Sequence, residues 1–126
     1  MEIYVVRHTK VAINEGICYG QTDVELADSF QEELAQLKNQ LPSEFDQVFS
    51  SPLSRCKILA ETFSTKIIFD DRLKEMNFGD WEMKVWNDIP NDEIQPWYDD
   101  FVNYETPNGD SFESMYFRGA SFFEEL

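Results

Sequence analysis

Three short stretches of the sequence carry side chains that could act on a phosphate group. Arg7-His8-Thr9 follows an apolar run near the N-terminus, Arg55 comes four residues after Ser51, and Glu75 begins an aromatic and acidic stretch. A phosphoryl group carries charge on its non-bridging oxygens, so a site for it needs fixed positive groups. The planar guanidinium of arginine can hold two of these oxygens at once. The two arginines are therefore candidates for holding a phosphate.

Histidine is scarce in this chain, and so is positive charge. His8 is the only histidine, and there are only 10 lysine and arginine residues. A lone histidine usually serves the core through hydrogen bonds, but a position beside an arginine at the end of an apolar strand favours a functional role. A cation in the first turn of a helix opposes the macrodipole by some tenths of a kcal/mol unless an anion binds there. Arg55 is expected at such a place.

Strands are predicted where short apolar runs occur. Residues 3–6 form a continuous apolar run that suits a central parallel strand, and two further short strands are predicted over 47–50 and 66–69. Helical patterns separate these runs, which predicts an α/β fold with a mostly parallel sheet flanked by helices in three layers.

Helices are predicted from apolar spacing and from capping residues. The first extends from Ser29 to Leu41, with Ser29 and Glu32 as a capping box. The second begins at Ser51-Pro52, which offers a cap and a first-turn proline. Further along, a short helix over 85–89 and another over 92–104 are expected.

The last helix follows the turn Pro107-Asn108-Gly109, and its predicted caps are Asp110 and Glu113. It runs to Leu126 without a C-terminal cap. A typical sheet has about five or six strands, against the three predicted here. We therefore expect the sheet to be incomplete at the C-terminus, as in a truncated chain.

Length and composition narrow the classes of function. A chain of 126 residues suits a single domain over 1–126, and 42% apolar residues can build a core. The net charge of -15 disfavours nucleic acid and anionic membranes as partners. Cys18 and Cys56 have no metal-type spacing, and no apolar run is long enough to span a membrane. Without a signal peptide, the expected location is the cytoplasm.

Taken together, the motifs resemble the histidine phosphatase (phosphoglycerate mutase-like) superfamily. Arg7-His8-Thr9 is similar to its Arg-His-Gly/Thr signature, and residues 51–55 are similar to its Ser-x-x-x-Arg helix start. Residues 75–82 are similar to its Glu-x-x-Phe/Tyr-Gly-x-Trp-Glu stretch. The three matches come in the family's order and cover essentially the whole chain.

The resemblance implies a role for each matching residue. His8 would attack phosphorus and form a phosphohistidine that water hydrolyses, and Glu75 would protonate the leaving group. Arg7, Arg55 and Asn14 would bind the phosphate, although ordinary turn chemistry accounts for Asn14 equally well. The partner would be a small phosphorylated substrate, with no metal and no cofactor. The loop bordering this substrate would comprise Tyr19, Gly20, Gln21 and Thr22.

Three further stretches resemble one branch of the superfamily. Residues 18–24, 78–83 and 106–112 are similar to bacterial alpha-ribazole phosphatases, which remove the 5′-phosphate of alpha-ribazole phosphate during assembly of the cobalamin nucleotide loop. A broad-specificity histidine phosphatase is the nearer alternative. A phosphoglycerate mutase-like enzyme fits less well, because mutases usually carry extra basic residues.

One departure from the superfamily affects every functional interpretation. Members have a second catalytic histidine late in the chain, and this sequence has none after His8. Two hypotheses follow: a truncated part of an active enzyme, or an inactive module that binds phosphorylated ligands or a partner. A sheet cut short would also expose strand edges and apolar helix faces, which predicts self-association.

Overall fold

Two units, each built from two separate stretches of sequence, make up the fold. The computed structural model describes all residues from Met1 to Leu126. Unit 1 comprises residues 1–13 and 23–70, and unit 2 comprises residues 14–22 and 71–126. That residues 1–126 form one domain stays a prediction.

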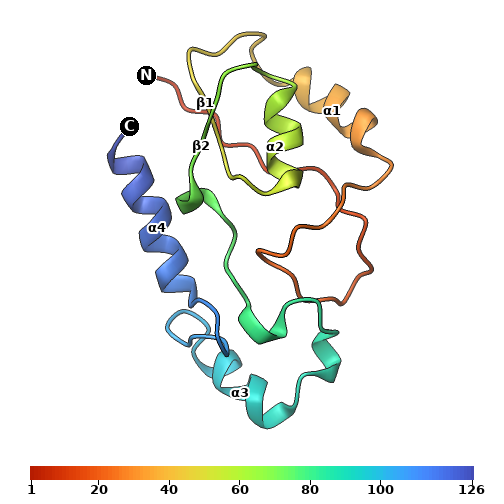
Figure 1. Cartoon of the computed structure of the whole chain (residues 1–126), viewed down its shortest axis with the longest axis vertical. Helices are drawn as coiled ribbons and strands as arrows, with labels where there is room; N and C mark the ends of the chain where they lie inside the picture. The colour runs from red at the N-terminus through yellow and green to blue at the C-terminus, as the bar shows by residue number, and fades with distance from the viewer. The chain divides into compact units, whose positions relative to one another are not determined.

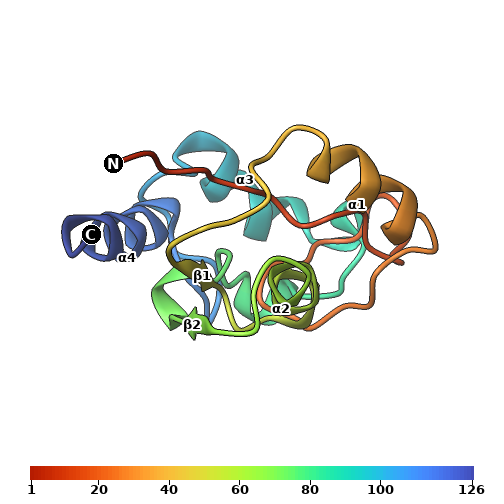
Figure 2. The ribbon, with the colours of Figure 1, turned by 90° about the horizontal axis from the view of Figure 1, so that it is seen from above.

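Unit 1 contains the parallel sheet. Its elements are α1 (Phe30–Lys38), β1 (Val48–Ser50), α2 (Ser54–Glu61) and β2 (Ile67–Phe69) (Figure 1). The two strands pair in parallel, with Val48 opposite Ile67 and Ser50 opposite Phe69. Helix α2 connects the strands and lies beside them (Figure 2). The expected α/β fold with a parallel sheet and flanking helices is confirmed.

Residues 3–6 do not form the predicted central strand. They are drawn as coil (Figure 1), and Val5 is 81% exposed. A strand exists only where its N–H and C=O groups pair with a neighbouring strand, and β1 and β2 pair only with each other. Further along this stretch, Val11 forms an isolated antiparallel bridge with Leu26. An apolar run predicts that a segment can be buried, but it does not supply the partner.

The two helices of unit 1 start differently from the prediction. At α1, the Ser29 hydroxyl donates to the carboxylate of Glu33 at 2.8 Å and caps no backbone N–H group, so the capping box with Glu32 is wrong. The helix ends at Lys38, before Leu41. Helix α2 begins at Ser54 rather than at Ser51-Pro52. The Ser51 hydroxyl instead accepts from the N–H of Leu53 at 3.3 Å, which holds a turn ahead of the helix.

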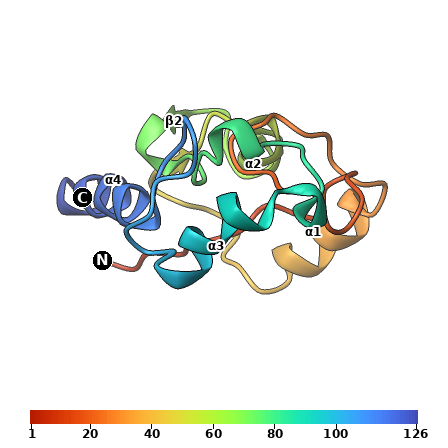
Figure 3. The ribbon, with the colours of Figure 1, turned by 90° about the horizontal axis from the view of Figure 1, so that it is seen from below.

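Unit 2 consists of irregular backbone, three short 3₁₀ helices and two α-helices. The 3₁₀ helices are η1 (Asp71–Leu73), η2 (Gly79–Trp81) and η3 (Trp86–Asp88), and the last replaces the helix predicted over 85–89. The α-helices are α3 (Asn91–Asp99) and α4 (Phe112–Glu124). Figure 3 shows α3 and the coil that leads from it to α4.

Both α-helices of unit 2 have ends that differ from the prediction. Helix α3 stops at Asp99 instead of continuing to Tyr104, because the Asp100 carboxylate accepts from the N–H of Asn103 and folds the chain into a turn. The cap of α4 is Ser111, whose hydroxyl accepts from the N–H of Ser114 at 3.0 Å. The predicted cap Asp110 has other partners, described below.

Trp81 lies at the centre of the unit 2 core and is fully buried. Its ring meets that of Trp97 edge to face, with centroids 6.0 Å apart. Its indole N–H donates to the Glu93 carboxylate, so the polar atom of the buried ring has a partner. The other members of the cluster are buried or half-buried: Cys18, Phe78, Trp86, Ile89, Ile94 and Tyr104.

We expect Trp81→Phe to lower the free energy of unfolding by about 2 kcal/mol, because it leaves a cavity and removes the donor to Glu93. Urea unfolding followed by far-ultraviolet circular dichroism measures this change. Tyr116→Ala is the control, since Tyr116 is 61% exposed and its loss should cost about 0.5 kcal/mol or less. Equal losses in the two variants would contradict the central place of Trp81.

Candidate active site

His8 follows the N-terminal coil of unit 1 and is half-buried. Its Nδ1 lies 2.7 Å from the carbonyl oxygen of Thr9. A carbonyl oxygen can only accept, so Nδ1 must carry the proton of this hydrogen bond. In a neutral imidazole the lone pair is then on Nε2, the nitrogen that can act as a nucleophile.

Arg55 is buried in the first turn of α2 and is only 1% exposed. The helix start that carries it is capped from a distant part of the sequence. One carboxylate oxygen of Asp23 accepts from the N–H of Ser54 at 2.9 Å, and the other accepts from the Ser54 hydroxyl at 2.7 Å. Asp23 thus replaces Ser51 as the cap of α2. Arg7, by contrast, is exposed.

The other predicted site residues belong to unit 2. Asn14 and Glu75 are exposed, while Tyr19, Gln21 and Thr22 are half-buried and Gly20 is buried. The structure brings the predicted substrate loop to the backbone of Glu75, because the side-chain amide of Gln21 donates to the Glu75 carbonyl oxygen at 3.0 Å. The Glu75 carboxylate accepts from the N–H of Met76 at 2.9 Å. His8, Arg7 and Arg55 lie in unit 1, so the predicted set is divided between the two units.

Glu82 is a residue whose importance the sequence did not reveal. Its carboxylate accepts from the backbone N–H groups of Gly20 at 2.9 Å and Thr22 at 2.8 Å, and from the Thr22 hydroxyl at 2.7 Å. It also accepts from the N–H of Phe78 at 3.0 Å. One signal was available in the sequence: Glu82 is the last residue of an aromatic motif. A carboxylate that only faced solvent would have no obvious use at that position.

Arg118 and Asp110 hold the same segment from the side of α4. The Arg118 guanidinium donates to the carbonyl oxygen of Lys74 at 3.1 Å and pairs with the Asp110 carboxylate at 2.9 Å. Asp110 also accepts from the N–H of Asn77 at 3.0 Å. These bonds explain why Asp110 does not cap α4, and they fix the backbone on both sides of Glu75.

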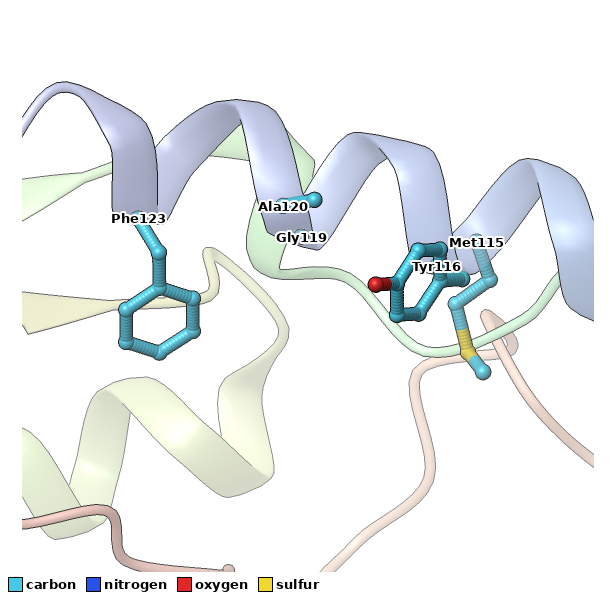
Figure 4. Close-up of a pocket in the computed structure, with 5 residues that line it drawn as sticks. All are labelled: Met115, Tyr116, Gly119, Ala120 and Phe123. Atoms are coloured by element: carbon cyan, nitrogen blue, oxygen red, sulfur yellow. The ribbon is translucent and has the colours of Figure 1, made fainter.

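A shallow depression of about 380 Å³ lies on one face of α4 (Figure 4). Its lining contains no cation, and none of the predicted site residues takes part in it. It does not resemble a phosphate site. The residues that line it are Met115, Tyr116, Gly119, Ala120 and Phe123. Self-association through exposed apolar surface such as this stays a prediction.

No helix combines the length and the apolar character needed to cross a bilayer.

Comparison with known proteins connects this geometry to a family. The profile of the histidine phosphatase superfamily (branch 1) matches residues 3–126. The fold agrees: the crystal structure of the alpha-ribazole phosphatase from Shigella flexneri superposes with a TM-score of 0.86 at 26% identity, over 96% of this chain and 64% of that one. The chain belongs to the histidine phosphatase superfamily.

Two curated relatives are similar over nearly the whole chain. A Hydrogenobacter thermophilus protein under the provisional name phosphoserine phosphatase 2 is 32% identical, over 98% of this chain and 66% of its own length. The adenosylcobalamin/alpha-ribazole phosphatase of Salmonella typhimurium is 26% identical, over 100% of this chain and 67% of its own length. The chain therefore spans about two-thirds of the length of these relatives.

Asp23 makes the stability of unit 1 depend on pH. The hydrogen bonds from the Ser54 hydroxyl and N–H, and then the charge of Arg55, lower the pKa of the Asp23 carboxyl. A lowered folded-state pKa gives stability that is present above the ordinary aspartate pKa of about 3.9 and is lost as the pH falls through the folded value.

We expect Asp23→Asn to cost about 0.5 kcal/mol at pH 7, because Asp23 is exposed and solvent screens its charge. This difference from the native protein should shrink between pH 4 and pH 2. Urea unfolding at a series of pH values measures it. The exposed Asp46 offers a matched control in Asp46→Asn. A difference that is the same at every pH would rule out the charged cap.

Cys18 should resist alkylation. Burial, and second the negative charge of Glu82, raise the pKa of the Cys18 thiol to about 12. At pH 8 roughly one such thiol in ten thousand is ionised, against about a quarter for an ordinary cysteine. Iodoacetamide followed by peptide mass spectrometry should modify the half-buried Cys56 first and Cys18 only after urea unfolds the chain. Modification of Cys18 at the rate of Cys56 under native conditions would refute this.

Proposed function

We propose that this protein is a phosphomonoesterase that works through a phosphohistidine at His8. The observation that carries the proposal is the hydrogen bond from His8 Nδ1 to the Thr9 carbonyl oxygen, at 2.7 Å. This bond selects the tautomer in which Nε2 holds the lone pair, and it keeps the ring oriented. Membership of the histidine phosphatase superfamily supports the same assignment.

The proposed reaction has two steps. First, His8 Nε2 attacks phosphorus, the ester P–O bond breaks, and the leaving alkoxide takes a proton from the carboxyl of Glu75. Second, water attacks the phosphohistidine, its proton passes to the Glu75 carboxylate, and the P–N bond breaks. The products are an alcohol and inorganic phosphate. Arg7, Arg55 and Asn14 would offset the charge on the phosphate oxygens in both steps.

The proposed substrate is alpha-ribazole 5′-phosphate, used in cobalamin nucleotide-loop assembly. It is supported by the similarity to the Salmonella typhimurium and Shigella flexneri phosphatases. A phosphoserine-type substrate is the second candidate, because the Hydrogenobacter thermophilus relative has the higher identity, at 32%. Broad specificity, or a phosphoglycerate mutase-like activity, is an alternative within the same family.

A non-catalytic module is the alternative of a different class. The chain has no histidine other than His8, and the superfamily pattern includes a second one. A module of this kind would bind phosphorylated ligands and release no phosphate. Turnover therefore separates the two classes directly.

The test is phosphate release by the intact gene product from alpha-ribazole 5′-phosphate, phosphoserine and p-nitrophenyl phosphate. We expect His8→Ala to remove turnover of all three substrates by a factor on the order of a thousand or more, because the nucleophile is lost. Glu75→Gln should lower hydrolysis of the two alkyl esters about a hundredfold or more. It should affect the first step with p-nitrophenyl phosphate much less, because nitrophenolate departs without a proton. The initial burst of nitrophenolate measures that step apart from hydrolysis of the phosphohistidine, in which Glu75 takes a proton from water.

The exposed Glu105 provides the matched control for charge, since Glu105→Gln should leave all three rates unchanged. Failure of the native protein to release phosphate from any of the three compounds would reject the catalytic proposal. Binding of a phosphate ester without turnover would then favour the non-catalytic module.

A further inference from the structure

We infer that Glu82 is a positioning residue, which fixes the loop Tyr19–Thr22 at the segment that begins with Glu75. The inference rests on the proposed function, because it treats this loop as the border of the substrate site. Glu82 itself has no role in the two chemical steps described above. Its carboxylate acts through the loop and through the backbone that it binds.

The carboxylate of Glu82 is bonded on both of its oxygens. Oε1 accepts from the N–H of Gly20, the N–H of Thr22 and the Thr22 hydroxyl, at 2.7 to 2.9 Å. Oε2 accepts from the N–H of Phe78 at 3.0 Å. A carboxylate has about four lone-pair sites and no proton to donate, so four converging donors suit it and suit no neutral side chain. One side chain thus joins the loop to the turn that follows Glu75.

The loop also packs directly on this segment. A Cβ added to Gly20 would lie 1.8 Å from the carbonyl oxygen of Met76, so backbone meets backbone with no room for a side chain. At the next residue, the Gln21 amide donates to the carbonyl oxygen of Glu75 at 3.0 Å. The loop is therefore bonded at Glu75, packed at Met76 and bonded again to Glu82, whose other oxygen binds the N–H of Phe78.

This arrangement bears on catalysis because Glu75 itself is exposed. An exposed carboxyl acquires a defined position only from the backbone that carries it. The contacts of the loop supply that constraint on the side of Gln21, and Glu82 holds the loop in place. Weakening the Glu82 bonds should blur the border of the substrate site and the position of Glu75 while leaving the nucleophile intact.

Glu82→Gln is the sharpest variant, since it keeps the size of the side chain. It replaces one acceptor oxygen with an amide that donates, so at least one backbone N–H group then faces another donor. Thr22→Val is the second variant, because it keeps the shape and the backbone N–H of residue 22 and removes only the hydroxyl bond. Glu105→Gln is again the matched control.

Hydrogen–deuterium exchange on the 126-residue chain tests whether Glu82 holds the loop, without any reference to activity. Glu82→Gln should speed exchange of the amides of Gly20, Thr22 and Phe78 about tenfold or more relative to Glu105→Gln, with the β1 and β2 amides unchanged. Thr22→Val should change the same amides in the same direction by less. If Glu82→Gln does not fold, Thr22→Val decides alone. Unchanged exchange in the loop of a folded variant overturns the inference.

Steady-state kinetics of the intact gene product test whether the position of the loop affects substrate binding. We expect Glu82→Gln to raise KM for the preferred alkyl phosphate about tenfold while kcat toward p-nitrophenyl phosphate stays within about threefold. The effects of Glu82→Gln and Thr22→Val should not add, because the two side chains share one bond. If Glu82→Gln lowers the melting temperature and leaves KM unchanged, the role of Glu82 is structural only, and the inference is rejected.

The two proposals fail differently. Absence of turnover in the native protein rejects the proposed function, and it leaves the exchange experiment to decide whether Glu82 holds the loop. Turnover that depends on His8 together with unchanged loop exchange in Glu82→Gln keeps the function and rejects the positioning role.

Discussion

Unit 2 buries irregular backbone, and the N–H groups of that backbone must find acceptors within the fold. In a sheet or a helix the ladder supplies them, but the stretch from Glu75 to Glu82 contains only one short 3₁₀ helix. Side chains supply the acceptors instead. Glu82 serves Gly20, Thr22 and Phe78, and Asp110 serves Asn77. The order of the candidate-site residues in unit 2 depends on these acceptors, because they fix the backbone that carries Glu75 and the loop Tyr19–Thr22.

The same constraint accounts for part of the acidic composition. A net charge of -15 by itself indicates a surface covered with solvated acidic side chains. Yet several carboxylates act as internal acceptors: Glu82 for the loop, Glu93 for the buried indole of Trp81, and Asp23 for the start of α2. A carboxylate suits this work because it accepts several bonds and donates none. The positions of these acids are set by backbone geometry more than by solubility.

Local pattern predicted the order of elements well and their ends poorly. The runs at 47–50 and 66–69 placed β1 and β2 to within a residue, since each of these strands has the other to pair with. The predicted caps of α2 and α4 failed because residues distant in sequence intervene, whereas Ser29 at α1 bonds locally to Glu33 instead of capping. Asp110 is taken by Asn77 and Arg118, and α2 is capped by Asp23 instead of Ser51. A capping motif shows what a side chain can do locally, but it cannot show a competing acceptor or donor some 30 residues away. Residues 3–6 show the same limit of local pattern for a strand, because an apolar run does not reveal whether a neighbouring strand is there to pair with it.

For the candidate site, the motifs point to residues that could carry the chemistry and give little sign of those that hold them. His8, Arg55 and Glu75 are unusual in type or place, so the sequence draws attention to them. Asp23 and Glu82 are two of 25 acidic residues, and although both lie within matched stretches, only their bonds show what they hold. Thr22 and Asp23 are adjacent in the chain, yet Thr22 is bound by Glu82 in unit 2 and Asp23 caps the Arg55 helix in unit 1. This dipeptide therefore serves two separate sets of contacts, one that holds the loop beside Glu75 and one at the start of the helix that carries Arg55.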